Sequence, residues 1–358
     1  PARIYPPLYI YVSSFFVCLF GESYTSARFV SFLSVIGTEV MLGALVWRKT
    51  SSGFAALLAS GFYAGMYGIV SFFYTTARID SLYVFLILVF FYAVRVASEK
   101  GGIAVMLAMV AAVGAILTKQ PAVVVVFALC LWCLFVQNIR ARVMAVLCVI
   151  AVLASQIIPL LTGNSWYFYY VYEVPSAHPL SLNLLQDFLY KDLFRSLSSG
   201  FVLAMLAIYF LFKKPSGKQE AFLFLIFFAA MMFAGFAPRI KIGGNVNNLM
   251  PIVAAIALCC GLAAGLLQDA KGWPKVLIVI LLICFNIQIA YRPPRIDSNL
   301  AARIHEETID VFRTLEAPVF APCHPYSSIL AGKNPSAFWG AFYDVSITTG
   351  DPARNLRE

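Results

Sequence analysis

Five basic residues stand at the ends of apolar runs, in surroundings that suit the binding of an anion. They are Arg28 in Ser-Ala-Arg-Phe-Val, Arg78 in Thr-Thr-Ala-Arg-Ile-Asp, Lys119 in Leu-Thr-Lys-Gln-Pro, and the pair Arg239 and Lys241. The pair runs into Gly-Gly-Asn-Val-Asn-Asn, whose glycines allow a ligand to come close to the backbone. Cations gathered at one face of a membrane suit a phosphate at headgroup depth, such as that of a lipid carrier. Each side chain alone could equally reach to water, so only their joint placement favours the phosphate site.

Acidic residues that could act as a base are few. Asp80 begins an apolar run two positions after Arg78, where capping of the helix or pairing with the arginine explains it better than catalysis. Glu173 ends a run of aromatic residues and is, with Asp80, a weak candidate for the catalytic base. Glu39 lies inside an apolar run, where an acid is a functional candidate by default, although a hydrogen bond between helices accounts for it. The chain has 3 histidines, which does not favour a dedicated metal site, and none is predicted.

The composition indicates that membrane-spanning helices position these residues. Of 358 residues, 61% are apolar and 12% are charged, and the mean hydropathy is +0.83. A soluble domain carries roughly 25% charged residues, so a water-soluble globular protein is excluded. At roughly 20 residues for each crossing, the apolar runs predict about ten spanning helices. They cover residues 29–47, 53–74, 82–97, 103–118, 122–136, 143–161, 196–212, 221–237, 249–267 and 276–290. A further run, 8–20, is short for a crossing and is expected to be an interfacial helix.

Basic residues in short loops set the direction of these spans. Alternate loops carry Arg48, Lys49, Arg95, Lys100, Arg140, Arg142, Lys213, Lys214, Lys218, Lys271 and Lys275. An excess of lysine and arginine marks the cytoplasmic side, so the opposite side, with Arg28, Arg78 and Lys119, is expected to be extracytoplasmic. The net charge of +9 reflects this bias, and no binding of nucleic acid is expected.

The sequence divides into three parts. Residues 1–25 are expected to be the end of a first extracytoplasmic loop with the interfacial helix, and residues 26–291 the transmembrane region. Residues 292–358 are expected to begin a small, incomplete extracytoplasmic soluble domain of α/β-like character, with an amphipathic helix over 299–315 and a strand over 318–322. The whole is predicted to be an all-α polytopic protein of a bacterial inner membrane.

Four short motifs, taken in order, resemble one family of membrane enzymes. They are Tyr5-Pro6-Pro7-Leu8-Tyr9, Leu19-Phe20-Gly21-Glu22 followed by Ala27-Arg28, Ala77-Arg78-Ile79-Asp80, and Leu117-Thr118-Lys119-Gln120-Pro121. Their order resembles the polytopic glycosyltransferases of the C-type fold, and most of all the superfamily of protein O-mannosyltransferases and lipid A aminoarabinose transferases. Those enzymes use dolichyl or polyprenyl phosphate sugars as donors.

The resemblance implies roles for several residues. It places Tyr5-Pro6-Pro7 in the first extracytoplasmic loop, Arg28 at the outer start of the second span, and the segment 239–248 near the lipid-phosphate pocket. Tyr5, Asn245 and Asn248 are then candidates for binding substrate. In the family the catalytic carboxylate precedes the Pro-Pro motif, so the resemblance implies that the chain is truncated at its N-terminus and that its base lies upstream of Pro1.

A transferase of this kind moves a sugar from a lipid phosphate to an acceptor hydroxyl. A carboxylate orients and deprotonates the acceptor, and fixed cations stabilise the charge on the departing phosphate. Arg78, Lys119, Arg239 and Lys241 are the candidates for the second role, with Arg28 in support. The expected partners are the lipid bilayer, a polyprenyl phosphate-linked sugar, and a glycolipid, polysaccharide or protein acceptor. The fold also admits a divalent metal, but no residue pattern requires a cofactor.

Two other classes of function remain open on the sequence alone. A flippase or secondary transporter for a lipid carrier would also place polar residues between spans, but it would carry them near mid-membrane and show broken helices in related halves. Here the charges collect at one face and no halves match, which favours the enzyme. A scaffold or sensor whose tail binds a partner is the third reading.

Overall fold

A computed structural model describes residues 4–136, 138–161, 165–213, 217–267, 272–289, 298–316, 319–321, 325–334 and 343–346. Over these residues the chain is almost entirely helical and no strand is formed, apart from one isolated bridge between Leu180 and Lys241. The predicted all-α polytopic fold is therefore confirmed.

Each of the ten predicted spans corresponds to a helix. The long bundle helices are α2 (Tyr24–Thr50), α3 (Gly53–Gly65), α4 (Asp80–Lys100), α5 (Gly102–Ile116), α6 (Ala122–Phe135), α7 (Ile139–Leu161), α11 (Ser196–Lys213), α12 (Lys218–Arg239), α13 (Met250–Leu266) and α14 (Trp273–Gln288). Six helical segments of the described residues are long and apolar enough to cross a membrane by length and composition. The chain is a multi-pass integral membrane protein.

The second predicted span differs from the expectation. The run 53–74 is not one helix, because α3 ends at Gly65 and two short 3-10 turns follow, η1 (Met66–Gly68) and η2 (Phe73–Thr75). Ser71 and Phe72 between them have positive φ angles of 48° and 65°. Apolar composition alone did not reveal this turn, since its aromatic side chains are as hydrophobic as those of a helix.

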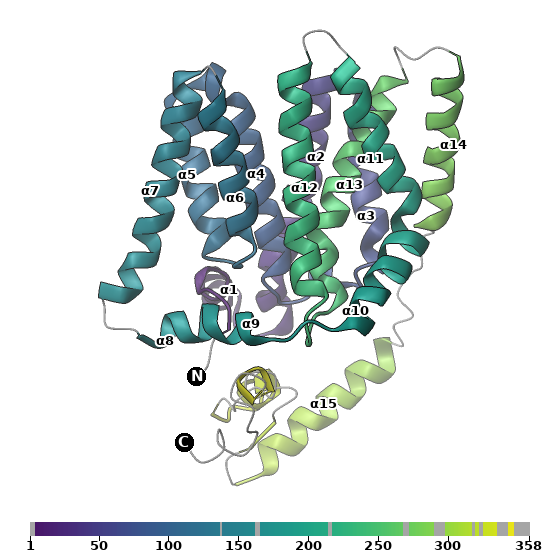
Figure 1. The fold of residues 1–358 in the computed structure, drawn as a ribbon. Helices are drawn as coiled ribbons and strands as arrows, with labels where there is room; N and C mark the ends of the chain where they lie inside the picture. The colour runs from purple at the N-terminus through teal and green to yellow at the C-terminus, as the bar shows by residue number, and fades with distance from the viewer. Residues whose placement is uncertain are drawn as a thin grey trace.

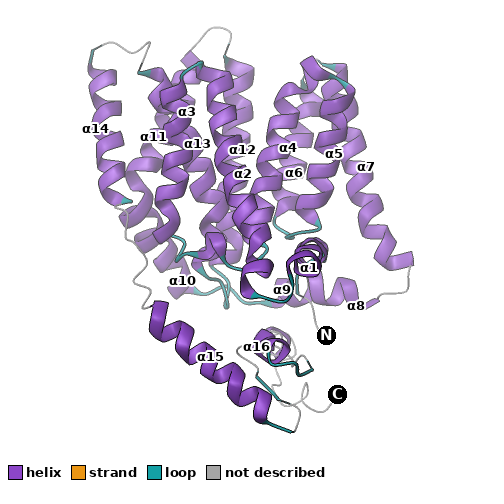
Figure 2. Cartoon of the chain, turned by 180° about the vertical axis from the view of Figure 1, so that it is seen from behind, coloured by secondary structure: helices purple, strands orange, loops and turns teal. Residues whose placement is uncertain are grey.

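The bundle helices form two groups that meet along α2 with α4 and α6 with α12 (Figures 1 and 2). One group is α4 to α7, and the other is α2, α3 and α11 to α14. Helix α13 lies inside the second group, where all its residues from Met250 to Gly265 are buried. Small residues permit this, since a Cβ on Gly261 would stand 2.6 Å from the Cβ of Ala59 in α3.

One end of the bundle is crossed by short helices. Helix α1 (Leu8–Phe20) lies across this end, as the sequence predicts for an interfacial helix (Figures 1 and 2). The segment between the predicted spans 143–161 and 196–212 is mostly helical where it is described. It contains α8 (Ser165–Phe168), η3 (Tyr169–Glu173), α9 (Val174–Ala177), α10 (Leu182–Asp187) and η4 (Phe188–Arg195).

At the opposite end, charged residues join three helices. Arg95 of α4 and Lys49 of α2 both pair with Glu220 of α12, and Arg48 pairs with Glu99. These basic residues of the predicted cytoplasmic loops therefore also fix the ends of helices.

The tail packs near the end of the bundle that carries α1. It contains α15 (Ser298–Thr314), which confirms the predicted helix, and α16 (Pro325–Leu330). Of the strand expected over 318–322, the described residues 319–321 lie in no strand, so the α/β-like character is not seen there. Tyr24 at the start of α2 contacts the rings of His305 and Tyr326, and its hydroxyl lies 3.1 Å from the Ser327 Oγ.

Candidate functional site

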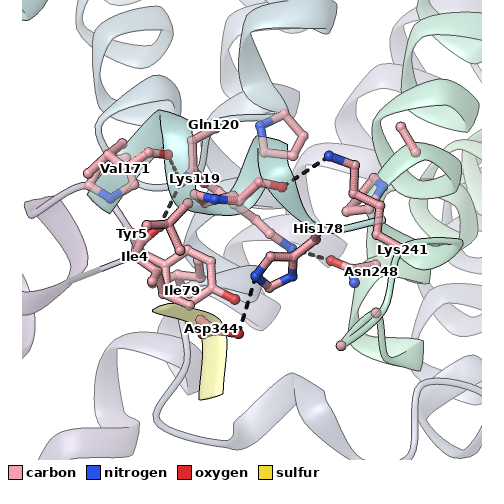
Figure 3. Close-up of a pocket in the computed structure, with 18 of the residues that line it drawn as sticks. Ile4, Tyr5, Ile79, Lys119, Gln120, Val171, His178, Lys241, Asn248 and Asp344 are labelled. Carbon is pink, nitrogen blue, oxygen red and sulfur yellow. Dashed lines mark hydrogen bonds and ion pairs between the residues drawn. The ribbon is translucent and has the colours of Figure 1, made fainter. Parts of the chain in front are cut away.

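A cavity of about 750 Å³ lies at the end of the bundle that α1 and α9 cross. Its walls come from segments that are distant in the sequence: the residues before α1, the turns before α4 and between α5 and α6, α9, the end of α12 and the tail (Figure 3). Of the predicted site residues, it brings together Tyr5, Arg78, Lys119, Lys241 and Asn248.

Lys119 is held at the centre of a buried polar network. It follows the end of α5, where the helix dipole favours a cation, and Pro121 two positions later directly precedes α6. Its Nζ donates to the Oδ1 of Asp80 at 2.6 Å and to the Oδ1 of Asn248 at 2.8 Å. Asn247 donates to the same Asp80 oxygen at 3.0 Å. Lys119 is only 4% exposed, so its ammonium is fixed in position and does not reach to bulk water.

Arg78 adds a second positive charge to this network. Its Nε lies 3.5 Å from the Oδ2 of Asp80, an oxygen that has no hydrogen-bond partner among the described residues, and its guanidinium stands over the Phe73 ring at 5.0 Å. One carboxylate thus faces two cations, Arg78 and Lys119. The group keeps a net positive charge on the cavity wall.

Lys241 supplies a third cation from the other side. Its Nζ donates to the carbonyls of Pro175 at 3.0 Å and Ser176 at 3.2 Å, and it pairs with no carboxylate among the described residues. Burial lowers its pKa. The bridge between Leu180 and Lys241 fixes the backbone here, and Gly244 lets it turn, because a Cβ at that position would meet the Pro238 carbonyl at 2.4 Å.

Tyr5 and Gln120 close the wall near α1. Burial, followed by the charge of Asp80, raises the pKa of Tyr5 to about 12, so its phenol remains a hydrogen-bond donor at neutral pH. The Nε2 of Gln120 donates to the carbonyls of Ile4 at 2.7 Å and Val171 at 2.6 Å. This amide therefore ties the segment before α1 and the segment before α9 to the turn that carries Lys119.

The tail adds a residue that sequence reasoning missed. Asp344 lines the cavity, and its Oδ1 lies 3.7 Å from the Nε2 of His178, whose Nδ1 lies 3.0 Å from the Ile242 carbonyl (Figure 3). Burial raises the pKa of Asp344, and the nearby His178 opposes that shift. No motif surrounds Asp344, so its position could not be inferred from the sequence.

Five predicted site residues do not line the cavity. One is Asp80, which is bonded to Lys119 in the buried network. Arg239 is buried, and its Nε donates to the Oδ2 of Asp192 at 2.8 Å, which joins the end of α12 to η4. Arg28 is exposed and stands over the Tyr24 ring at 5.9 Å. Asn245 caps η5 (Val246–Leu249) with its Oδ1, and Glu173 is exposed.

Residues 5–162 match the family described as dolichyl-phosphate-mannose-protein mannosyltransferase. The matched segment contains Arg78, Asp80 and Lys119, and it precedes Lys241 and Asn248. The resemblance drawn from the sequence is confirmed. No curated protein matches the chain.

Two crystal structures of the oligosaccharyltransferase from Archaeoglobus fulgidus are similar in fold. The structure tethered with an acceptor peptide containing the NVT sequon shares 12% identity with a TM-score of 0.50, and it matches 98% of this chain and 55% of that one. The complex with Zn and sulfate shares 14% identity with a TM-score of 0.49, over 94% of this chain and 54% of that one. The chain thus has the fold of a C-type glycosyltransferase and spans about 55% of the length of the oligosaccharyltransferase.

Proposed function

We propose that the protein is a glycosyltransferase that moves a sugar from a polyprenyl or dolichyl phosphate to an acceptor hydroxyl. The observation that carries the proposal is the cavity itself, in which Arg78, Lys119 and Lys241 face the same space at one end of a membrane bundle. Asp80 balances only part of that charge. A phosphate is the anion that such a cavity suits.

The cavity also has a wall for a lipid chain. This wall is lined by apolar residues of three helices: Phe233, Ala234 and Ala237 of α12, Val124 of α6 and Ile10 of α1. Phe233 is exposed on the outside of the bundle. An apolar wall that is continuous with a lipid-facing residue suits the first isoprene units of a carrier. The carrier phosphate would then lie near the cations, with its chain in the bilayer.

The chemistry would be direct displacement at the anomeric carbon. The acceptor oxygen forms the new bond to that carbon, the bond to the carrier phosphate oxygen breaks, and the acceptor proton passes to a base. The phosphate gains negative charge as it leaves, and the cations are already in place, so they stabilise the transition state more than the ground state.

The base is proposed to come from neither of the two weak candidates. Asp80 is bonded to Lys119 and Asn247, and Glu173 lies outside the cavity. In the family that the sequence resembles, the carboxylate precedes the Pro-Pro motif, and we propose the same origin here.

The identities of the sugar and of the acceptor are proposed from the names of the relatives. The matched family is described by dolichyl-phosphate-mannose and a protein acceptor, and the tethered oligosaccharyltransferase carries an acceptor peptide. We therefore propose that the transferred sugar is mannose or another hexose rather than a pentose. We propose that the acceptor is a protein or peptide rather than a glycolipid or polysaccharide. The cavity and the tail are proposed to face the extracytoplasmic side of a bacterial inner membrane.

The test uses the full-length protein in liposomes with polyprenyl phosphate mannose and an acceptor peptide. Release of polyprenyl phosphate and mannosylation of the peptide are expected together, and Arg78→Gln should slow both. Phe222→Leu, a change on the lipid face of α12, serves as the matched control. Movement of the intact carrier across the bilayer without release of phosphate would contradict the enzyme and favour a flippase.

A further inference from the structure

His178 lines the cavity with one of its ring nitrogens bonded to the backbone. Its Nδ1 lies 3.0 Å from the carbonyl oxygen of Ile242. A carbonyl oxygen only accepts hydrogen bonds, so Nδ1 carries the hydrogen. In the uncharged ring the lone pair is then on Nε2, which is a hydrogen-bond acceptor. The contact with Ile242 therefore decides what the ring offers to the cavity.

Two backbone hydrogen bonds hold the ring in this orientation. The N–H of Ile242 donates to the carbonyl of Pro179 at 2.9 Å, and the N–H of Ser181 donates to the carbonyl of Ile240 at 2.9 Å. His178 directly precedes the first of these paired segments and is bonded to the second. Its acceptor nitrogen is therefore in place before a ligand arrives, and a group positioned in this way loses little entropy on binding.

The Nε2 of His178 faces a second acceptor. This nitrogen is buried and has no hydrogen-bond partner among the described residues. The Oδ1 of Asp344 lies 3.7 Å away, which is longer than a hydrogen bond, and both residues line the cavity (Figure 3). A buried acceptor without a donor is unfavourable, and a donor that enters from the cavity removes this penalty.

An uncharged hydroxyl is the donor that this position suits. Asp344 repels an anion such as the carrier phosphate, and a further cation would be repelled by Arg78, Lys119 and Lys241 of the same cavity. A metal ion needs three or four protein ligands, and no group of three His, Cys, Asp or Glu side chains that could hold one occurs in the part of the chain that the structure describes. A hydroxyl donates its hydrogen and brings no charge.

The position of His178 favours the transferred sugar as the source of that hydroxyl. Ile242, to which the ring is bonded, directly follows Lys241, one of the cations proposed to bind the carrier phosphate. The sugar is bonded to that phosphate and so lies next to it in the cavity. The acceptor hydroxyl that reacts gives its only hydrogen to the base and has none left for Nε2.

We propose that the Nε2 of His178 accepts a hydrogen bond from a hydroxyl of the transferred sugar and thereby contributes to the choice of sugar. This inference rests on the proposed function. A fixed acceptor favours a sugar that places a hydroxyl in front of it, because an analogue without that hydroxyl leaves the buried nitrogen without a partner.

Binding of carrier analogues to the full-length protein in liposomes tests this assignment. Polyprenyl phosphate mannose is compared with its monodeoxy forms, each of which lacks one hydroxyl, by competition against fluorescent polyprenyl phosphate. No acceptor is present, so no sugar is transferred. One deoxy form should bind the wild type about tenfold more weakly than the mannose form. In His178→Asn the two forms should bind equally, because the partner of that hydroxyl is gone.

Two variants of His178 separate this role from a structural one. In His178→Asn the amide nitrogen takes the place of Nδ1, so the bond to Ile242 is kept and the acceptor is lost. In His178→Gln the side-chain carbonyl takes the place of Nε2, so the acceptor is kept. His178→Gln should therefore retain the preference for the mannose form. If His178→Asn retains the preference and His178→Gln loses it, the ring only supports the fold and the proposal is wrong.

Two further outcomes overturn the proposal. One is a wild type that binds all the deoxy forms as tightly as the mannose form. The other is a His178→Asn variant that weakens binding of the acceptor peptide alone, which would assign the donor to the acceptor. A wild type that distinguishes the carrier analogues but transfers no sugar contradicts the proposed function and leaves the sugar contact of His178 in place. A wild type that binds none of the carriers contradicts both.

Discussion

Lys119 and Asp80 form a buried ion pair of 2.6 Å although 39 positions separate them in the chain. The two residues come from the turn between α5 and α6 and from the first residue of α4. The pair holds the lysine side chain in one position, and the Asp80 carboxylate offsets its positive charge. Arg78 adds a second cation, so the group remains net positive. The cavity is therefore built around a cation that is positioned before any ligand arrives.

The first prediction follows from this pair. Lys119→Gln should lower kcat at least a hundredfold, because a fixed cation has its greatest effect on the charge that develops in the transition state. The yield of folded protein should fall less, since Asn247 still donates to Asp80 and Arg78 still faces that carboxylate. Turnover with polyprenyl phosphate sugar and the amount of folded protein are measured side by side. Activity close to that of the wild type would return Lys119 to a purely structural role.

The second prediction concerns pH and Lys241. Burial lowers the pKa of its ammonium, so the charge is lost at a lower pH than for an exposed lysine. Binding of the carrier phosphate should weaken as pH rises through that lowered value, while it stays unchanged below it. Lys241→Arg should remove this alkaline decline, because arginine keeps its charge. The affinity for the carrier phosphate is measured as a function of pH for the wild type and for Lys241→Arg. The same loss of affinity at alkaline pH in both proteins would contradict the role of Lys241 in phosphate binding.

The third prediction is that Arg239 contributes to stability and not to binding of the carrier phosphate. Arg239 and Asp192 are both buried and pair with each other, so Arg239→Gln leaves an uncompensated carboxylate. Breaking such a pair costs roughly 3 to 5 kcal/mol of stability. The melting temperature should fall strongly, and the KM for the carrier in the surviving folded fraction should change less than twofold. The double variant with Asp192→Asn should recover part of the lost stability. A large effect on KM without loss of stability would place Arg239 in phosphate binding after all.

The sequence predicted most of the fold because hydrophobicity and length act locally. Nine of the ten apolar runs became single helices, and the run 53–74 became α3 followed by two 3-10 turns. The short run 8–20 became the transverse helix α1. Arg78 and Lys119 were found because each stands beside a helix end, a position that can be read from neighbouring residues. Contacts between distant segments could not be read in this way. The Asp192 partner of Arg239 lies in η4, between two predicted spans, and Asp344 reaches the cavity from the tail.

The fourth prediction tests the direction of the bundle. The cavity end is expected to be extracytoplasmic, because the basic short loops lie at the other end. In a cysteine-free protein in intact cells, Asp310→Cys in α15 should react with an impermeant maleimide. Lys213→Cys at the end of α11 should react only after the membrane is permeabilised. The reverse pattern would invert the topology and remove the proposed enzyme, since the site would then face the cytoplasm.

The last prediction concerns the acceptor side of the cavity. Asp344 comes from the tail and faces His178, whereas the three cations lie in the turn before α4, the turn between α5 and α6, and the segment after α12. A carboxylate is a poor neighbour for a phosphate but a good acceptor of hydrogen bonds from a hydroxyl. Asp344→Asn should therefore raise the KM for the acceptor several-fold and leave the KM for the carrier nearly unchanged.

Glu173→Gln is the matched control for that variant, because this carboxylate is exposed and lies outside the cavity. It should leave both constants within twofold of the wild type. If Asp344→Asn instead weakens the carrier alone, the tail borders the donor. If Asp344→Asn abolishes kcat while both KM values stay constant, Asp344 is the base, and the proposed upstream carboxylate is wrong. Steady-state kinetics with each substrate varied in turn distinguish these outcomes, because the two sides of the cavity are occupied by different substrates.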